Sequence, residues 1–407
     1  MRGVYEAVRL AEGFYWVGAV DWGLRDFHGY STHRGSTYNS YLLTSPRGGS
    51  IVFDAVKKPF MDVMLSRIAS VADPSSIELI VSNHAEMDHS GGLADLAAAA
   101  GGARILASPM GVKNLSMQLD GMEGISTVRD GEVVEVGGES ISFIETRMLH
   151  WPDSMFSYLP SRRILVSQDA FGMHLASSET SAHRIDPALL REEAGRYYAN
   201  ILLPYSQLVS KLLERVSAMD LGLDIIAPDH GQAWFAGTET GPGFITELYG
   251  RWAAQAPTLK AVVAYDTMWG STGMMAGAIA AGLREGGANP VVHPLHGSHR
   301  SDVAADLLEA GALVLGTPTI NGSMFPTMAD LVAYLGGLRR RNLVGAAFGS
   351  HGWSGEGVGR LSSAMSDMKI DLLHPGLASQ FRPGGDVLAS CRELGLGIAG
   401  RLRREVG

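Results

Sequence analysis

The sequence predicts an α/β protein in two parts, an N-terminal αββα sandwich followed by a C-terminal doubly wound parallel sheet. The first observation is length, because 407 residues exceed what one compact hydrophobic core usually spans. The second is a change of pattern after the glycine-rich run 237–243, where an irregular mixture of strands and helices gives way to regular strand–helix alternation. The third is that polar residues gather where predicted strands end. We therefore expect domains at 1–250 and 251–407.

Composition narrows the class of protein. The chain is 46% hydrophobic and 18% charged, as is usual for globular domains, and its net charge of -9 argues against a nucleic-acid partner. We find neither an apolar run of membrane-spanning length nor a leader pattern, so we expect a cytoplasmic protein without membrane contact. Cys391 is the only cysteine, which excludes an internal disulfide, an iron–sulfur cluster and a four-cysteine rubredoxin site.

The first 250 residues alternate irregularly between short strands and helices. We expect helices at 61–71 and 93–100, and a connecting helix at 244–254. The expected strands are 14–17, 38–43, 51–54, 77–81, 104–107, 132–136, 141–145, 164–167 and 223–227.

The strongest chemical signal follows the predicted strand 77–81. His84, Glu86, Asp88 and His89 lie within six residues, a spacing that predicts a metal-ligand cluster rather than a polar turn that merely caps a helix. The motif resembles that of the metallo-β-lactamase fold, which normally carries histidine at the position of Glu86 and holds zinc. A carboxylate there suits iron or manganese at least as well as zinc.

Three later residues have the position needed to complete a two-metal site. His150, Asp169 and His230 each follow a predicted strand, where a loop can aim a side chain into a cleft. Any one of them alone would more often be a capping or core residue. Together with the first motif they predict a dinuclear centre.

The second half repeats a strand followed by a helix five times, which predicts a flavodoxin-like sheet with its ligand at the C-terminal strand ends. The expected strands are 260–265, 290–293, 312–316, 343–348 and 371–373. The expected helices are 272–284, 303–309, 328–338, 357–368 and 386–402.

The first strand-to-helix turn, 265–273, has the composition of a phosphate loop. It offers the hydroxyls of Thr267, Ser271 and Thr272, and Gly270 allows backbone N–H groups to close on an anion at a helix N-terminus. The loop resembles that of flavodoxins, with Trp269 beside Met268 where flavodoxins usually have threonine. Because no Gly-x-Gly-x-x-Gly is present, FMN is favoured over a dinucleotide; a helix cap that binds nothing is the alternative.

Two more turns are placed to hold an isoalloxazine ring, with backbone amides at its polar edge and Trp353 stacked on its face. The residues expected to contact FMN there are Pro318, Thr319, Asn321 and Gly322 in one turn, and Ser350, His351, Gly352, Trp353 and Gly355 in the other.

Taken together, these motifs resemble those of the flavodiiron proteins, and the resemblance covers essentially the whole chain. It implies a metallo-β-lactamase-like diiron domain fused to a flavodoxin-like FMN domain. His84, Glu86 and His150 would bind one iron, Asp88, His89 and His230 the other, and Asp169 would bridge them, with no departure at any of these positions. The implied activity is reduction of O2 to water, of NO to N2O, or both.

The resemblance also implies partners and neighbouring residues. His28 and His174 lie in segments that resemble those around the family's diiron pocket, and would be hydrogen-bond donors or proton sources beside the ligands. Tyr197 and Tyr198, in an expected helix, could offer a phenol to a bound intermediate. A buried residue with a hydrogen-bond partner explains each of the four about as well. A head-to-tail homodimer, or a tetramer of such dimers, would bring one chain's FMN to the other's irons, with the loop 22–30 reaching the partner. The electron donor would be external: a rubredoxin, a reductase or a reduced deazaflavin.

Two other classes of function remain open from sequence. One is a dizinc hydrolase with a flavodoxin-like regulatory domain, since the same ligands could activate water. Glu86 in place of histidine argues against it. The other is an electron carrier whose metal domain is only structural, which an intact ligand set disfavours.

Overall fold

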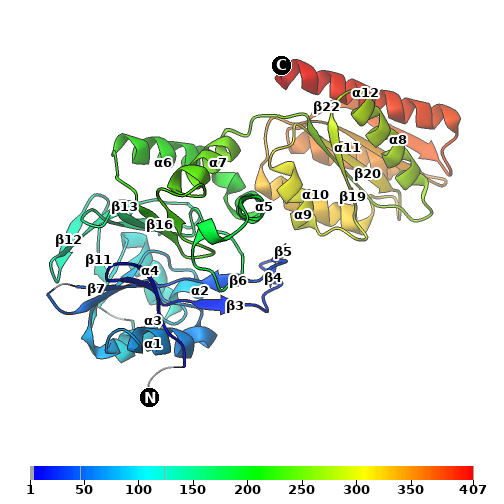
Figure 1. Ribbon diagram of the computed structural model, residues 1–407. Coiled ribbons are helices and arrows are strands. Elements are labelled where there is room, and N and C mark those ends of the chain that lie inside the picture. Colours follow the sequence, from blue (N-terminus) through cyan, green and yellow to red (C-terminus); the bar gives the residue numbers. More distant parts are fainter. Residues whose placement is uncertain (1–3, 46, 123, 407) are drawn as a thin grey trace. The chain divides into compact units, whose positions relative to one another are not determined.

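The computed structural model describes residues 4–45, 47–122 and 124–406, and its α/β architecture confirms the predicted fold class (Figure 1). The chain forms two compact units. The first comprises residues up to Phe27, Thr32–Tyr197 and Gln207–Gly250. The second comprises His28–Ser31, Tyr198–Ser206 and the chain from Arg251 onward. Two short segments of the N-terminal half therefore pack with the second unit.

The first unit contains two large sheets. One has the order β1-β2-β7-β8-β9-β10-β11, with bounds Val8–Ala11, Phe14–Trp16, Tyr41–Thr44, Ser50–Phe53, Ile77–Ser82, Arg104–Ala107 and Ser126–Thr127. The other runs β12 to β17 in chain order, with bounds Val133–Val136, Glu139–Glu145, Met155–Leu159, Ile164–Gln168, Ile225–Pro228 and Trp234–Phe235. Small sheets pair β3 (Ala19–Asp21) with β6 (Ser36–Tyr38) and β4 (Asp26–Phe27) with β5 (Tyr30–Ser31).

Alternation along the strands explains how the two sheets pack. Ile51 and Phe53 of β8 join the core between the sheets, opposite Phe143 of β13. Val52, one residue away, turns to the helix layer, because successive side chains of a strand point to opposite faces. That layer holds α1 (Met61–Ala69), α3 (Leu93–Ala100) and α4 (Pro109–Gln118). Further helices follow, namely α5 (Pro187–Tyr197), α6 (Ser206–Ala218) and α7 (Pro242–Ala254).

The expected strand 38–43 is wrong as one element. It divides into the end of β6 and the start of β7, which belong to different sheets. Asn39 breaks it, because its backbone N–H donates to the Asp229 carbonyl (2.7 Å) and its side-chain amide donates to Pro228 O (2.6 Å). The break brings this segment against the end of β16, beside the metal motif. The sequence also missed β14, α4 and α6.

The second unit has a five-stranded parallel sheet of order β19-β18-β20-β21-β22. The strands are Asn289–Pro294, Lys260–Tyr265, Ala312–Pro318, Val344–His351 and Asp371–Gln380 in that order. The helices between and after them are α8 (Ser271–Glu285), α9 (Arg300–Leu307), α10 (Pro326–Leu338), α11 (Glu356–Asp367) and α12 (Gly385–Val406). The sheet order reverses between β18 and β20, which is where ligands bind in open α/β sheets.

Helices α8 and α12 cover one face of this sheet and approach each other closely (Figure 1). A Cβ on Gly282 would lie 2.0 Å from the Arg392 carbonyl oxygen, and one on Gly395 would lie 2.2 Å from that of Ile279. Only glycine therefore fits at these two positions.

Helix α9 contacts the two N-terminal segments of the second unit, His28–Ser31 and Tyr198–Ser206. Arg300 Nη2 donates to Gly29 O (3.1 Å), and Ser31 N donates to Ser301 Oγ (3.1 Å). From the other segment, Asn200 Nδ2 donates to Ser301 O (3.3 Å). Among the described residues, no helix combines the length and apolar character needed to span a membrane.

Candidate metal centre and flavin pocket

The metal motif forms the turn after β9, and a buried carboxylate fixes that turn. Asp54, at the end of β8, accepts hydrogen bonds from the backbone N and the side-chain Nδ2 of Asn83, each at 2.7 Å. His84 follows in the turn, Glu86 has extended backbone, and Asp88 and His89 lie on the short helix α2 (Met87–Ser90). The four motif side chains are thereby turned into the protein, each at most 7% exposed.

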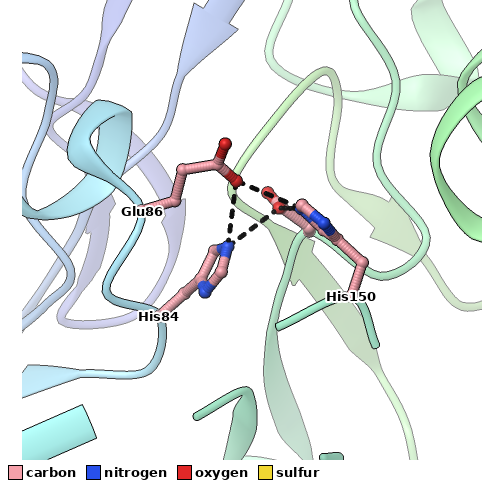
Figure 2. A group of neighbouring side chains, drawn as sticks. His84, Glu86 and His150 are labelled. Atoms are coloured by element: carbon pink, nitrogen blue, oxygen red, sulfur yellow. Dashed lines mark hydrogen bonds and ion pairs between the residues drawn. The ribbon is translucent and has the colours of Figure 1, made fainter. Parts of the chain in front are cut away.

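His84, Glu86, His150 and Asp169 form a first group whose ligand atoms converge, as Figure 2 shows for the first three. Glu86 Oε2 lies 3.3 Å from His84 Nε2 and 3.1 Å from His150 Nε2. Asp169 Oδ2 lies 2.9 Å from His150 Nε2 and 3.4 Å from His84 Nε2. Two imidazole nitrogens and two carboxylate oxygens therefore surround one point.

Asp88, His89 and His230 form a second group. Asp88 Oδ2 lies 3.3 Å from His230 Nε2 and 3.5 Å from His89 Nε2. The other oxygen of Asp169, Oδ1, lies 3.1 Å from His89 Nε2 and 3.5 Å from His230 Nε2. The single carboxylate of Asp169 thus faces the first group with one oxygen and the second group with the other.

The residues present fit a pair of metal ions. Both Asp88 oxygens are buried without a hydrogen-bond partner, an expensive arrangement unless a cation compensates it. His89 Nε2 and His230 Nε2 lie only 3.1 Å apart, as two lone pairs directed at one ion would. Imidazole and carboxylate ligands without thiolate suit iron, manganese or zinc. The arrangement can therefore hold two metals that share the Asp169 carboxylate.

The charges within this cluster hold protons where metals would bind. Burial lowers the pKa of His89, but Asp88 and Asp169 outweigh it and raise that pKa to about 10. Burial raises the pKa of Asp169, but His89, together with hydrogen bonds from His150 and His84, holds it well below its usual range. Metal ions compete with protons for such imidazoles, so binding metal would release them.

The other ring nitrogens of three histidines also face oxygen atoms, a feature that the sequence analysis missed. Nδ1 of His230 lies 2.6 Å from Thr37 O, Nδ1 of His84 lies 3.5 Å from Asp153 Oδ2, and Nδ1 of His89 lies 3.6 Å from Asp229 Oδ2. Such partners orient metal-binding imidazoles. The only sequence signal was that Asp229 directly precedes the predicted ligand His230 and that Asp153 follows His150 by three residues.

The predicted surrounding residues divide into two sets. His174 is buried with Nδ1 2.8 Å from Ser36 Oγ, and its ring lies 4.6 Å from that of His230 and 5.1 Å from that of Tyr197. Tyr198 belongs to the second unit, where its hydroxyl donates to Ser206 Oγ (3.2 Å). His28 is exposed between β4 and β5 and belongs to neither metal-ligand group.

The second unit contains a pocket of about 990 Å³ at the C-terminal ends of β20 and β21. Most residues expected to bind FMN line it, namely Met268, Trp269, Gly270, Ser271, Pro318, Thr319, Asn321, Gly322, Ser350, His351, Gly352 and Trp353. The lining residues that the sequence missed are Met274, Ile320, Ser354, Phe381 and Arg382. Trp269 and Trp353 are 94% and 93% exposed, so both rings stand free at the pocket.

Three predicted contacts, Thr267, Thr272 and Gly355, do not line the pocket. Thr272 is buried, and its Oγ1 lies 2.9 Å from Ser350 Oγ, so it joins two pocket loops from behind. Gly355 lies directly before α11, where a Cβ would meet the His351 ring at 3.2 Å. The Thr267 hydroxyl is buried without a hydrogen-bond partner.

Both halves match known families and whole-chain relatives. The model of the ODP family beta lactamase matches residues 37–231, and the flavodoxin model matches 263–395. A nitric oxide reductase of Moorella thermoacetica is 40% identical, over 98% of this chain and 99% of that protein. The rubredoxin oxygen:oxidoreductase structure from Desulfovibrio gigas has a TM-score of 0.95 at 34% identity, covering 98% and 99% of the two chains. The flavodiiron protein structure from Giardia intestinalis has a TM-score of 0.93 at 32% identity, covering 99% of each.

Proposed function

This chain belongs to the flavodiiron protein family, and from that premise we propose how its residues reduce NO or O2. The protein is an oxidoreductase of the NO- and O2-reducing kind, as its relatives' names indicate. The hydrolase that the metal motif had left open is therefore set aside. What remains to propose is the role of each residue, the metals, the flavin and the electron donor.

The observation that carries the metal assignment is the position of Asp169 between the two groups. We assign His84, Glu86 and His150 to one iron, Asp88, His89 and His230 to the other, and Asp169 to both. When bound, the iron pair would hold the small oxidant and pass it electrons stored on FMN. The chain's own contribution is burial, which keeps bulk water from the cluster, and carboxylates that balance the cationic charge.

Protons must accompany the electrons, because O2 yields water and NO yields N2O with water. His174 and Tyr197 are the groups that we propose to hydrogen-bond the bound oxidant while it takes up these protons, because both pack against His230 at the edge of the second metal group. Tyr197 is buried, and burial, followed by the nearby carboxylates, raises the pKa of its phenol well above its usual value. The phenol therefore keeps its proton and can offer it as a hydrogen-bond donor.

FMN fits the pocket of the second unit. The backbone N–H groups at the start of α8, beside the buried Thr267 hydroxyl, suit a phosphate, because a helix N-terminus favours an anion. The ring would lie against Trp353, with the backbone of the loop after β20 at its polar edge. Pocket size supports a flavin mononucleotide, since such cofactor sites span roughly 300–1,000 Å³.

The donor and the assembly complete the proposal. A relative named for rubredoxin suggests a rubredoxin as the donor. A head-to-tail homodimer, in which each chain's flavin serves the partner's irons, is the assembly that we propose. Two inactive variants test it when mixed, one lacking a metal ligand and one lacking FMN. Activity should return in mixed dimers if electrons cross the interface, and should stay absent if each chain works alone.

The central experiment measures iron, zinc and flavin in protein purified without oxygen, followed by O2 and NO consumption after photoreduction. We expect about two irons and one FMN per chain. Consumption of either gas that requires both cofactors supports the proposal. Two zincs with FMN would call for reconstitution with ferrous iron, and an inactive reconstituted protein would refute the assigned centre.

A further inference from the structure

Asp229 combines complete burial with an unusual lack of hydrogen bonds. Its side chain is 0% exposed, and neither carboxylate oxygen has a hydrogen-bond partner. Its backbone is fixed on both sides, because its N–H donates to Gln168 O (2.8 Å) and its carbonyl accepts from Asn39 N (2.7 Å). The carboxylate is thereby held in the interior, and its nearest cationic partner is Nδ1 of His89, 3.6 Å from Oδ2.

The neighbouring buried carboxylates differ, because each has a folding role. Asp153 Oδ2 accepts from Ala85 N (2.6 Å), and its Oδ1 accepts from Asn114 Nδ2 (2.9 Å). Asp54 likewise holds the motif turn through Asn83. Asp229 makes no such bond from its side chain. A structural role in the metal-free protein therefore does not explain why a carboxylate is buried at this position.

The surroundings of His89 supply the explanation. Its Nε2 faces Asp169, Asp88 and His230, the side from which a metal would bind, so the proton of the metal-binding imidazole would lie on Nδ1, toward Asp229. A carboxylate behind a metal-binding imidazole fixes the tautomer and strengthens the ligand. We propose that Asp229 is a positioning residue for His89 and strengthens metal binding selectively in the group formed by Asp88, His89 and His230. This inference rests on the proposed metal centre.

The test is metal affinity, which does not depend on turnover. Metal-free native protein and Asp229→Asn are titrated with ferrous iron without oxygen, against a competing chelator, and the ions bound per chain are counted. We expect two tight ions in the native protein. In the variant, one ion should bind as tightly as before and the other about 10–100-fold more weakly. Asp95→Asn makes the same chemical change at an exposed position of α3 and should match the native protein.

A double-mutant cycle separates positioning from general damage. If Asp229 acts through His89, then Asp229→Asn should cause no further loss of affinity in the His89→Ala background. Equal weakening of both ions, or a full additional loss without His89, would overturn the inference. Circular dichroism checks folding, and Asp229→Ala, which adds no amide, serves if Asp229→Asn does not fold.

The outcomes also separate this inference from the proposed function. A native protein that binds no iron would refute the metal centre itself. A native protein and an Asp229→Asn variant that both bind two ions with equal affinity would refute only the role of Asp229.

Discussion

Replacing Arg340 by methionine should destabilise the flavin-binding unit, because this guanidinium joins three parts of it. Arg340 is only 5% exposed, and its guanidinium donates to backbone carbonyl oxygens. Nη1 donates to Gln255 O (2.8 Å), Nη2 to Ala310 O (2.8 Å) and Nε to Leu307 O (3.3 Å). Gln255 directly follows α7, so Arg340 ties the entry of the chain into this unit to the end of α9.

Two opposing quantities determine the size of the effect. Hydrogen bonds from a charged donor contribute about 1.5–3 kcal/mol each, or roughly 5–9 kcal/mol for three. Burial lowers the pKa of Arg340 from 12.5 to about 10, which corresponds to a cost of about 3 kcal/mol for the buried charge. Methionine preserves the apolar stem but leaves the carbonyl oxygens without donors. We therefore expect a loss of about 2–5 kcal/mol in the free energy of unfolding.

Urea unfolding of the FMN-loaded protein, followed by flavin fluorescence, measures the stability of this unit. Arg339→Met makes the same change one residue earlier, at an exposed side chain, and should cost less than about 0.5 kcal/mol. A loss below about 1 kcal/mol for Arg340→Met, or equal losses for the two variants, would show that the buried bonds do not outweigh the burial cost.

Four other outcomes follow from contacts in the two units. Asp169→Asn should weaken the binding of both metals, whereas Glu86→Gln should weaken the binding of one. The iron retained per chain after dialysis measures this, and an equal loss in the two variants would contradict the position of Asp169 between the two groups. Trp353→Ala should raise the Kd of FMN about 2–10-fold by fluorescence titration, through loss of roughly 0.5–1.5 kcal/mol of stacking. Thr272→Val should cost about 1–3 kcal/mol of unfolding free energy by orphaning Ser350 Oγ, so unchanged stability refutes it. Burial raises the pKa of Asp306, but hydrogen bonds from His293 and Lys260 outweigh it and lower that pKa to about 2. The stabilisation from the ionised carboxylate is therefore complete above its ordinary pKa of 3.8 and is lost as the pH falls toward 2. In urea unfolding, the difference in stability between the native protein and Asp306→Asn should shrink over that range, and a difference that does not change with pH would contradict this.

The regular part of the fold could be predicted because its local signals agree. After Lys260 the predicted strand 260–265 is a continuous run of apolar residues and tyrosine, and the structure has β18 at those bounds. The strands β20 and β21 run further than predicted, to Pro318 and His351, because each finds a parallel partner where glycine and proline suggested a turn. Likewise β22 continues to Gln380 through an irregular register near His374. Pairing between distant strands decided these ends, and local sequence does not encode it.

The candidate site shows the same division. Ligand-type residues at strand ends could be named from sequence, and the structure brings all seven predicted metal ligands into two adjoining groups. The carboxylates behind them could not be identified, because the contact of Asp229 with His89 depends on how β16 packs and not on the local sequence. For the same reason, Tyr197 and Tyr198 looked equivalent as neighbours, yet they lie in different units.

The two segments that pack with the flavin-binding unit have a consequence for modularity. A gene cut after Gly250 separates the family matches cleanly, but it leaves behind His28–Ser31 and Tyr198–Ser206. The resulting fragment would expose the surface of α9 where Arg300 and Ser301 hold those segments. An exchange of this unit between relatives that keeps those contacts would therefore have to include all three pieces of chain.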